Sequence, residues 1–410
     1  MEEIRIALRN VGKIDPMSID DYIAAGGYEA LKKARTMDRG ELIGAIEETS
    51  RLRGRGGAAF PTGKKWSSAY NNDSEVKYIV CNADEGEPGT YKDRVIMEGD
   101  PHTVLEGILI GAYAVGSREC FIYVRGEYEK SIAVLRRAVA QAEEKGFCGD
   151  VTLKVVSGAG AYVCGEGTAI VNSLEGVRGE PRLKPPSMAV AGLHKKPTIV
   201  NNVETFAVIP EIISRGADWF GGIGQEKYPG TKVMCLSGDA EKKVCIEVPT
   251  DATLRDVVDG FGGGVAGGKA LKAIQLGGSS CGFIKPDQLD TPIDFDSIRG
   301  IGASLGSGAV YVIDETHNIV DILAQIARFY AHESCGKCTP CREGTLRLME
   351  IMDRFAAGEG TESDLEMIRA MDPYMKKSCF CPLGQSATTA ILSGLDQFPE
   401  DFEARMTKEG

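Results

Sequence analysis

Three cysteines, each separated from the next by two residues, are the feature that most constrains how this chain can fold. Cys335, Cys338 and Cys341 form a CxxCxxC run in a polar loop, and Cys381 follows further along the chain. Such a run places three thiolates around one small volume, and a remote fourth cysteine completes a cage for a cubane iron–sulfur cluster. Zinc is the alternative, but structural zinc sites more often use two separated pairs or mixed Cys/His sets. The spacing therefore favours iron–sulfur over zinc.

Composition and charge exclude several classes of protein. The chain has 410 residues, enough for two or three domains, and its net charge of −12 argues against a nucleic-acid or anionic-membrane surface. No apolar stretch approaches the ~18 residues of a membrane helix, and the charged start is not a signal peptide. Twelve cysteines without a secretion signal indicate a reducing compartment and metal use rather than disulfides. We therefore expect a cytoplasmic protein that binds no nucleic acid and does not itself insert into a membrane.

Hydrophobic patterning divides the chain into three parts. Strand-like runs at residues 77–82, 120–125 and 151–157 alternate with helical runs, which predicts an α/β fold with a parallel sheet covered on both faces. A hairpin expected over residues 231–248 begins a smaller α+β module. From Ile319 apolar residues recur at intervals of three and four, and Thr361 to Asp364 resembles a capping box, so the cysteine loop is expected to join two helices of a bundle.

Four loops rich in glycine or asparagine carry the other candidate binding residues, at 53–57, 82–89, 158–167 and 201–205. Glycines let backbone N–H groups approach a phosphate, arginine or lysine neutralises it, and carboxylates accept hydrogen bonds from ribose hydroxyls or a flavin ring. Each loop also has a simpler explanation: a flexible surface loop, solvation or a hard-cation site for the acidic residues, and a helix N-cap for Asn201 and Asn202. Together they favour one cleft for a large, flat, phosphorylated ligand.

Five motifs in this order closely resemble those of the NADH-binding flavoprotein (51 kDa-type) subunit of respiratory complex I and its relatives in NAD-linked hydrogenases and formate dehydrogenases: RGRGGAAFPTGKKW, CNADEGEPGTYKDR, GAGAYVCGEGTA, KPTIVNNVET and ESCGKCTPCREG. The resemblance extends from about Leu42 to about Gly394. It implies a Rossmann-like domain for FMN and NAD(H) at residues 1–230, a ubiquitin-like β-grasp domain at 231–315, and a helical bundle with one [4Fe-4S] cluster at 316–410.

The resemblance also implies the site residues. The FMN cradle would include Gly54, Gly56, Lys65, Asn82, Asp84, Glu85, Glu166, Asn201, Asn202 and Thr205, and the dinucleotide would pack beside Phe60, Glu87, Tyr162 and Lys184. The cluster ligands would be Cys335, Cys338, Cys341 and Cys381, with Cys379 as the spare, because the last cysteine of the family directly precedes a turn that here reads Pro-Leu-Gly. No side chain is expected to act as nucleophile or acid, since the cofactors carry the chemistry and Glu85 and Glu166 position the rings.

Two positions depart from the family pattern. Gly167 stands where a second acidic side chain is common, and Ser187 stands where an aromatic residue is expected over the nucleotide base, so NADP(H) rivals NAD(H) as the nucleotide. The expected function is electron transfer between NAD(P)H, FMN and the cluster in a complex with a thioredoxin-fold [2Fe-2S] subunit and a larger multi-cluster subunit, such as a hydrogenase or formate dehydrogenase. The alternatives are an electron relay that binds no nucleotide productively and a zinc-stapled interaction scaffold.

Metal analysis distinguishes an iron–sulfur protein from a zinc-stapled scaffold. We expect protein purified without oxygen to contain iron together with acid-labile sulfide, because the cysteine spacing suits a cubane. The measurement is metal content by mass spectrometry with a sulfide assay on the same sample. Zinc alone, without sulfide, would support the scaffold instead.

Overall fold

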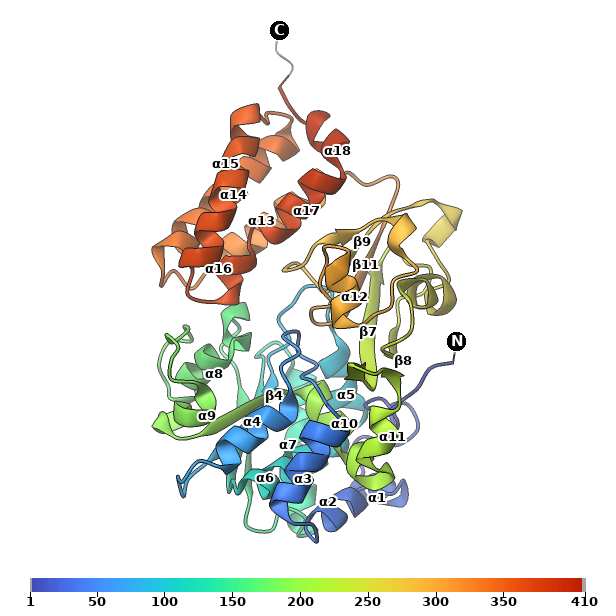
Figure 1. Ribbon diagram of the computed structural model, residues 1–410, viewed down its shortest axis with the longest axis vertical. Coiled ribbons are helices and arrows are strands. Elements are labelled where there is room, and N and C mark those ends of the chain that lie inside the picture. Colours follow the sequence, from blue (N-terminus) through green and yellow to red (C-terminus); the bar gives the residue numbers. More distant parts are fainter. Residues whose placement is uncertain (1, 408–410) are drawn as a thin grey trace.

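The computed structural model describes residues 2–407, which fold into a parallel sheet, a mixed sheet, a two-stranded ribbon and a helical bundle (Figure 1). The parallel sheet has the order β3-β2-β1-β4. Its strands are β1 (Tyr78–Ala83), β2 (Glu119–Val124), β3 (Thr152–Ser157) and β4 (Thr198–Asn202). The order of the strands in the sheet changes direction at β1, because β2 and β3 lie on one side of it and β4 lies on the other. In open α/β sheets, ligands bind outside the carboxyl ends of the strands at such a reversal.

Helices cover both faces of the parallel sheet, as the alternation predicted. Ile79 and Cys81 of β1 pack into a large core with α6 and α10, whereas Val80 packs on the opposite face with Ile170 of α8. The helices of this part are α1 (Ile19–Ala24), α2 (Glu29–Ala34), α3 (Arg39–Gly44), α4 (Thr62–Tyr70), α5 (Lys92–Gly99), α6 (Pro101–Val115), α7 (Glu129–Glu144), α8 (Gly167–Leu174), α9 (Met188–Ala191), α10 (Val203–Arg215) and α11 (Ala217–Gly221). A short ribbon of β5 (Gly224–Gln225) and β6 (Tyr228–Pro229) follows them.

The mixed sheet has the order β10-β9-β11-β7-β8. Its first and last strands, β7 and β11, lie parallel in the centre, while the other neighbours are antiparallel, which is the arrangement of a β-grasp fold. The hairpin predicted from residue 231 is confirmed as β7 and β8. The elements are β7 (Thr231–Gly238), β8 (Cys245–Pro249), β9 (Leu271–Leu276), β10 (Phe283–Ile284), α12 (Phe295–Gly300) and β11 (Ala309–Asp314).

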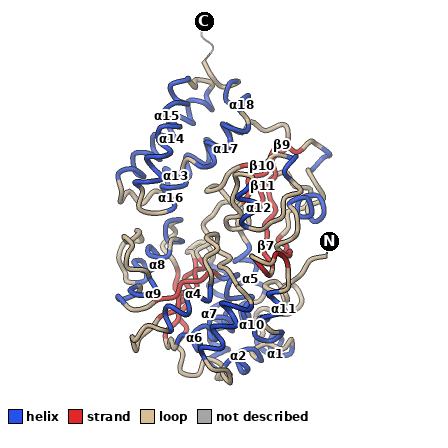
Figure 2. Tube along the Cα trace, in the orientation of Figure 1, coloured by secondary structure: helices blue, strands red, loops and turns tan. Residues whose placement is uncertain are grey.

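The remaining part of the chain is helical, as Figure 2 shows. Its helices are α13 (Ile319–Glu333), α14 (Thr339–Ala357), α15 (Glu362–Ser378), α16 (Pro382–Ser386), α17 (Thr389–Gln397) and α18 (Pro399–Glu403). The cysteine loop joins α13 to α14, and Thr361 and Asp364 form the predicted capping box of α15. Among residues 2–407 no helix is both long and apolar enough to cross a bilayer.

A buried carboxylate ties the parallel-sheet part to the mixed sheet. Glu204, at the start of α10, accepts hydrogen bonds from Lys232 Nζ at 2.5 Å and from the Val233 N–H at 2.8 Å, both on β7. Lys92 Nζ of α5 lies 3.0 Å from the same carboxylate. These three charged side chains are at most 1% exposed. Because a buried charge is tolerated only when it is paired, this contact fixes how the two sheets meet.

We predict that Lys232→Met destabilises the protein by roughly 3–5 kcal/mol, because methionine keeps the volume but removes one of the cations that balance buried Glu204. Urea unfolding measures the change. The matched control is Lys243→Met, an exposed lysine of the same module, whose effect should stay within about 0.5 kcal/mol. Equal midpoints for the two variants would show that the Glu204 contact does not hold the sheets together.

Candidate functional site

A cavity of about 860 Å³ opens beside the carboxyl ends of β1 and β4, at the reversal of strand order. Residues from the parallel-sheet part, the mixed sheet and the helical bundle all line it. The structure brings to this one cavity every residue that was expected around FMN or the dinucleotide, namely Gly54, Gly56, Phe60, Lys65, Asn82, Asp84, Glu85, Glu87, Tyr162, Glu166, Lys184, Asn201, Asn202 and Thr205.

Asparagines at the ends of two neighbouring strands form the floor of the cavity. Asn82 of β1 and Asn202 of β4 are direct partners across the sheet. Asn202 is fixed on both sides, since its Nδ2 donates to Asp93 at 2.6 Å and its Oδ1 accepts from Lys92 Nζ at 3.0 Å. Asn201 accepts from the Trp66 indole at 3.1 Å, but among the described residues its buried Nδ2 has no acceptor. An orphaned donor in a cavity wall fits a ligand that carries acceptor oxygens or nitrogens, as FMN does.

The glycine-rich loop at residues 53–60 closes on itself, with the Gly54 N–H donating to Phe60 O at 2.9 Å. A side chain at Gly56 would place its Cβ 3.0 Å from the Cβ of Asn202, so glycine allows this close approach. Arg55 does not reach the cavity. It is 1% exposed and donates to Pro229 O of β6 at 2.8 Å.

Lys65, rather than an arginine, supplies positive charge to the cavity at this point. Its Nζ donates to Val200 O at 3.0 Å, and burial, with the nearby charge of Lys184, lowers the pKa of Lys65. Among the described residues Lys65 pairs with no carboxylate, so a phosphate group of a ligand would balance its charge.

The acidic loop after β1 has two carboxyl groups that titrate near neutral pH. Burial, reinforced by Asp93, raises the pKa of Glu85 to about 7 although the group accepts from the Asp93 and Arg94 N–H groups at the start of α5. Burial also raises the pKa of Asp84 to about 7, against the opposing charge of Arg125. Both groups are therefore only partly charged at pH 7, which lessens their repulsion of an anionic ligand.

Glu87 and Tyr162 close the side of the cavity that faces the mixed sheet. The Tyr162 hydroxyl donates to Glu87 Oε2 at 2.7 Å, and Ser279 Oγ donates to Glu87 Oε1 at 2.5 Å. The Tyr162 N–H donates to Glu333 of α13 at 3.0 Å, and its ring lies edge-on to Phe329. All three parts of the chain thus hold this wall.

Glu166 serves two roles at the opposite wall. Its Oε2 accepts from the N–H groups of Thr168 and Ala169 at the start of α8, and its Oε1 accepts from Lys184 Nζ at 3.0 Å. These bonds hold the pKa of Glu166 below its usual value despite burial. Gly167 and Ser187, the two departures from the family pattern, line the same wall.

The cysteines converge at one end of the bundle. Cys338, Cys341, Cys379 and Cys381 are buried and Cys335 is half-buried. Cys338 and Cys381 are the N-cap residues of α14 and α16. Burial, reinforced by the nearby thiols of Cys338, Cys381 and Cys335 and opposed by the hydrogen bond with Ser334, raises the pKa of the Cys341 thiol to about 11. This donor set fits an iron–sulfur cluster, whose added positive charge would deprotonate the thiols.

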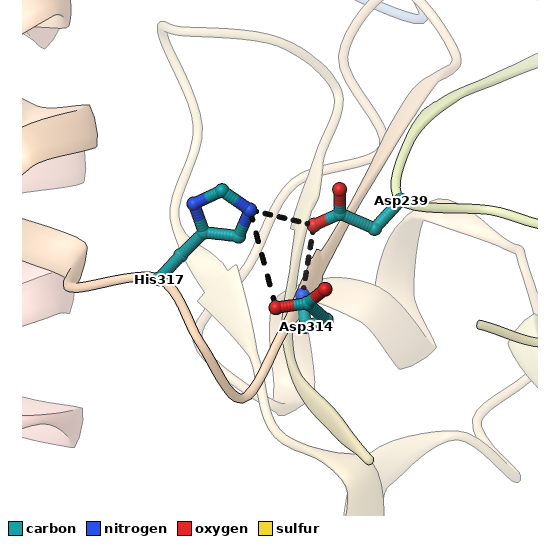
Figure 3. Close-up of side chains that lie close together, drawn as sticks. All are labelled: Asp239, Asp314 and His317. Atoms are coloured by element: carbon teal, nitrogen blue, oxygen red, sulfur yellow. Dashed lines mark hydrogen bonds and ion pairs between the residues drawn. The ribbon is translucent and has the colours of Figure 1, made fainter. Parts of the chain in front are cut away.

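A second group of possible metal ligands lies away from the cysteines. Among residues 2–407, Asp239, Asp314 and His317 bring their ligand atoms within 4.8 Å of one another (Figure 3). Lys269 Nζ lies 2.7 Å from Asp314 Oδ2 and already supplies a cation to this group. These side chains therefore form an ion-pair network at the ends of β7 and β11.

Cys381 belongs both to the cysteine group and to the cavity wall. It lines the cavity with Pro382, Leu383 and Ser386 of α16. The sequence predicted two sites, and the structure shows that the cavity reaches Cys381, the predicted cluster ligand at the start of α16.

Some lining residues were not predicted. The mixed sheet contributes Ser280, Cys281, Ser304, Gly306 and Ser307, and α5 contributes Lys92. The glycines around residues 277–278 and 306–308 were a signal for tight loops, since several have positive φ. Nothing in the sequence indicated that these loops face the first half of the chain.

Comparison with known proteins places the chain in a family. Residues 48–211 match the family model described as the Nuo51 FMN-binding domain, and residues 321–405 match the NADH-ubiquinone oxidoreductase-F iron-sulfur binding region. The chain is 47% identical to the NADP-reducing hydrogenase subunit HndC of Solidesulfovibrio fructosivorans, over 99% of this chain and 84% of that one. It is 44% identical to an NADH-quinone oxidoreductase subunit of Rhizobium meliloti (strain 1021), over 98% and 97%. The chain belongs to the Nuo51 family.

A solved structure supports the same placement. The Nuo51-family chain superimposes on a chain of an NAD+-reducing [NiFe]-hydrogenase with a TM-score of 0.86 and 36% identity, covering 93% of this chain and 65% of that one. It therefore spans less than two thirds of that solved chain's length. The predicted fold class is confirmed, as are the cofactors FMN, [4Fe-4S] and NAD(H) and the assignment to NADH dehydrogenase-type oxidoreductase subunits.

We predict that Cys381→Ser removes the cluster, whereas Cys379→Ser keeps it. A Cβ on Gly384 would lie 2.7 Å from Cys379 Sγ, so this thiol is packed against the turn, while Cys381 completes the set of four. Iron and sulfide content and the visible spectrum measure the outcome. The two serine variants control for each other, because both replace a buried thiol in the same loop. Loss of the cluster in Cys379→Ser alone would reverse the assignment.

Proposed function

We propose that this protein passes electrons between a nicotinamide nucleotide, FMN and a [4Fe-4S] cluster within a multi-subunit complex. One observation carries the proposal: the cavity that gathers the flavin-type loops is also lined by Cys381. A ligand in the cavity would then lie beside the cluster, with no third site needed between them. A scaffold or an isolated cluster protein has no use for such a cavity.

We propose distinct roles for the residues of the cavity. Gly54, Gly56 and Lys65 receive the phosphate of FMN, and Asn201 donates its unpartnered Nδ2 to the ring, with Asn82, Asp84, Glu85, Glu166, Asn202 and Thr205 completing the cradle. Phe60, Glu87, Tyr162 and Lys184 contact the nucleotide. Cys335, Cys338, Cys341 and Cys381 hold the cluster.

When bound, the cofactors would supply the redox chemistry, which is hydride exchange with the nucleotide and single-electron exchange with the cluster. The side chains would orient the cofactors and exclude water from the cavity. Glu85 and Glu166 act mainly by capping α5 and α8, which holds the loops that form the cradle. The Glu87–Tyr162–Ser279 contacts close the wall between the mixed sheet and α13.

Electrons must leave the cluster, and the chain has one evident cluster motif. We propose a thioredoxin-fold [2Fe-2S] subunit and a larger multi-cluster subunit as partners, with a hydrogenase or formate dehydrogenase as the terminal enzyme and the cytoplasm as the location. Relatives with the names hydrogenase subunit and quinone oxidoreductase subunit support a complex. We further propose three domains, at residues 1–230, 231–315 and 316–410, of which residues 1 and 408–410 lie outside the described residues.

Anaerobic titration tests this function. We expect NADH or NADPH to bleach the flavin absorbance of the holoprotein, and a dye acceptor to be reduced at the same time, because the cavity joins nucleotide, flavin and cluster. In Cys381→Ser the nucleotide should still bleach the flavin, since Cys381 and α16 form only one wall of the cavity. If neither NADH nor NADPH bleaches the flavin of the holoprotein, the protein is an electron relay that binds no nucleotide productively.

A further inference from the structure

Two cysteines of the mixed sheet face each other across neighbouring strands. Cys235 of β7 and Cys245 of β8 are direct partners in an antiparallel pair, and they are its last pair before the loop that connects the two strands. Residues that are directly opposed in this way place their side chains on the same face of the sheet. Both thiols are free, and the proposed electron transfer uses neither of them.

Backbone hydrogen bonds show how close the two cysteines lie. The Cys235 N–H points away from β8 and donates to Gly308 O, just before β11, at 2.9 Å. The next residue, Leu236, donates its N–H to Val244 O at 2.9 Å. Cys235 and Cys245 are therefore a non-hydrogen-bonded pair, whose Cα atoms lie about 4.5 Å apart in antiparallel sheets. Disulfides span Cα separations of roughly 4.4–6.8 Å, so the two sulfurs can bond without a large movement of either strand.

The surroundings of the two thiols differ. Cys235 is fully buried, whereas Cys245 is partly exposed, so a reagent from solution reaches Cys245 first. A hydrogen bond with Cys235, followed by burial, raises the pKa of the Cys245 thiol. Tyr91, between the acidic loop and α5, covers the pair from the other side. Its N–H donates to Cys235 Sγ at 3.4 Å, and its hydroxyl donates to Leu236 O at 2.8 Å.

We propose that Cys235 and Cys245 are a modification site, which closes to a reversible cross-strand disulfide by exchange with a low-molecular-weight disulfide such as oxidised glutathione. Cys245 first breaks the S–S bond of the reagent, forms a mixed disulfide and releases one thiol. Cys235 then attacks the Cys245 sulfur and displaces the second thiol. In total the two cysteines lose two electrons and two protons, which the reagent takes up as two thiols. In reducing surroundings the pair rests as the dithiol.

The disulfide would reinforce the contact between the two sheets. β7 also carries Lys232 and Val233, which bind the buried carboxylate of Glu204. A link between β7 and β8 restricts the unfolded chain and so stabilises the folded one. A disulfide sulfur can still accept from the Tyr91 N–H, which leaves the acidic loop in place. We therefore expect the modification to change stability and to leave the FMN content of the protein unchanged.

Mass spectrometry of the holoprotein tests the site directly. Trypsin cleaves after Lys232, Lys242 and Lys243. The two cysteines therefore fall in separate peptides, residues 233–242 and 244–255, each with one cysteine. The holoprotein is held without oxygen in mixtures of reduced and oxidised glutathione at about pH 8.5, because the thiolate is the attacking form and the pKa of Cys245 is raised. It is then alkylated and digested without reduction.

We expect the two peptides to be joined in more than half of the molecules when oxidised glutathione is in excess, and dithiothreitol to separate them again. Two separately alkylated peptides in every mixture would overturn the proposal. Peptides that each carry glutathione but are never joined would overturn it as well, because they would show that the thiols react without closing the bond.

Serine variants identify the partners. Cys235→Ser and Cys245→Ser should each abolish the joined peptides, whereas Cys148→Ser, which changes a buried thiol of the parallel-sheet part, should keep them. In urea unfolding the oxidised protein should have a higher midpoint than the reduced protein, and this difference should vanish in Cys245→Ser. Equal midpoints for the linked and unlinked wild-type protein would overturn the reinforcement of the sheet contact. Loss of FMN on oxidation would overturn the separation of this site from the cofactors.

Discussion

The buried carboxylate of Glu204 is the interaction on which the cavity depends. It binds Lys232 and the Val233 N–H of the mixed sheet, and it lies against Lys92, which in turn holds Asn202 on the cavity floor. The same α10 start therefore carries both the floor of the binding site and the contact between sheets. Since an unpaired charge at this depth is costly, the two sheets cannot separate without disturbing the floor.

Three parts of the chain together form one cavity, and none of them encloses it alone. The parallel sheet supplies the floor at its reversal of strand order, the mixed sheet supplies serine- and glycine-rich loops, and the bundle supplies Cys381. Glu87 shows how closely they meet, because it accepts hydrogen bonds from Tyr162 and from Ser279. Such a site at a domain junction can hold a large ligand while keeping its inner end away from water.

Electrostatics vary along this cavity. Near the floor, burial leaves Asp84 and Glu85 only partly charged at neutral pH, and Lys92 is balanced by Asp93 and Glu204. At the outer end of the cavity, the charged lining residues that are exposed to solvent are Lys64 and Lys184. A ligand with phosphates outside and a flat ring system inside suits both ends, which is the shape of FMN with a dinucleotide above it.

The sequence by itself determined the cluster loop, the two sheets and the lining loops, because each follows from a short-range pattern. The CxxCxxC spacing predicts the cluster loop, runs of apolar residues predict the strands, and clustered glycines predict the loops. Resemblance added the individual residues, and the structure brings every one expected around FMN or the dinucleotide to one cavity. Only the tertiary structure decided that Arg55 turns away from the cavity, that loops near residues 280 and 306 form its wall, and that Cys381 reaches it. These facts depend on contacts between residues far apart in the chain, which packing and buried charge pairs determine and local pattern does not encode.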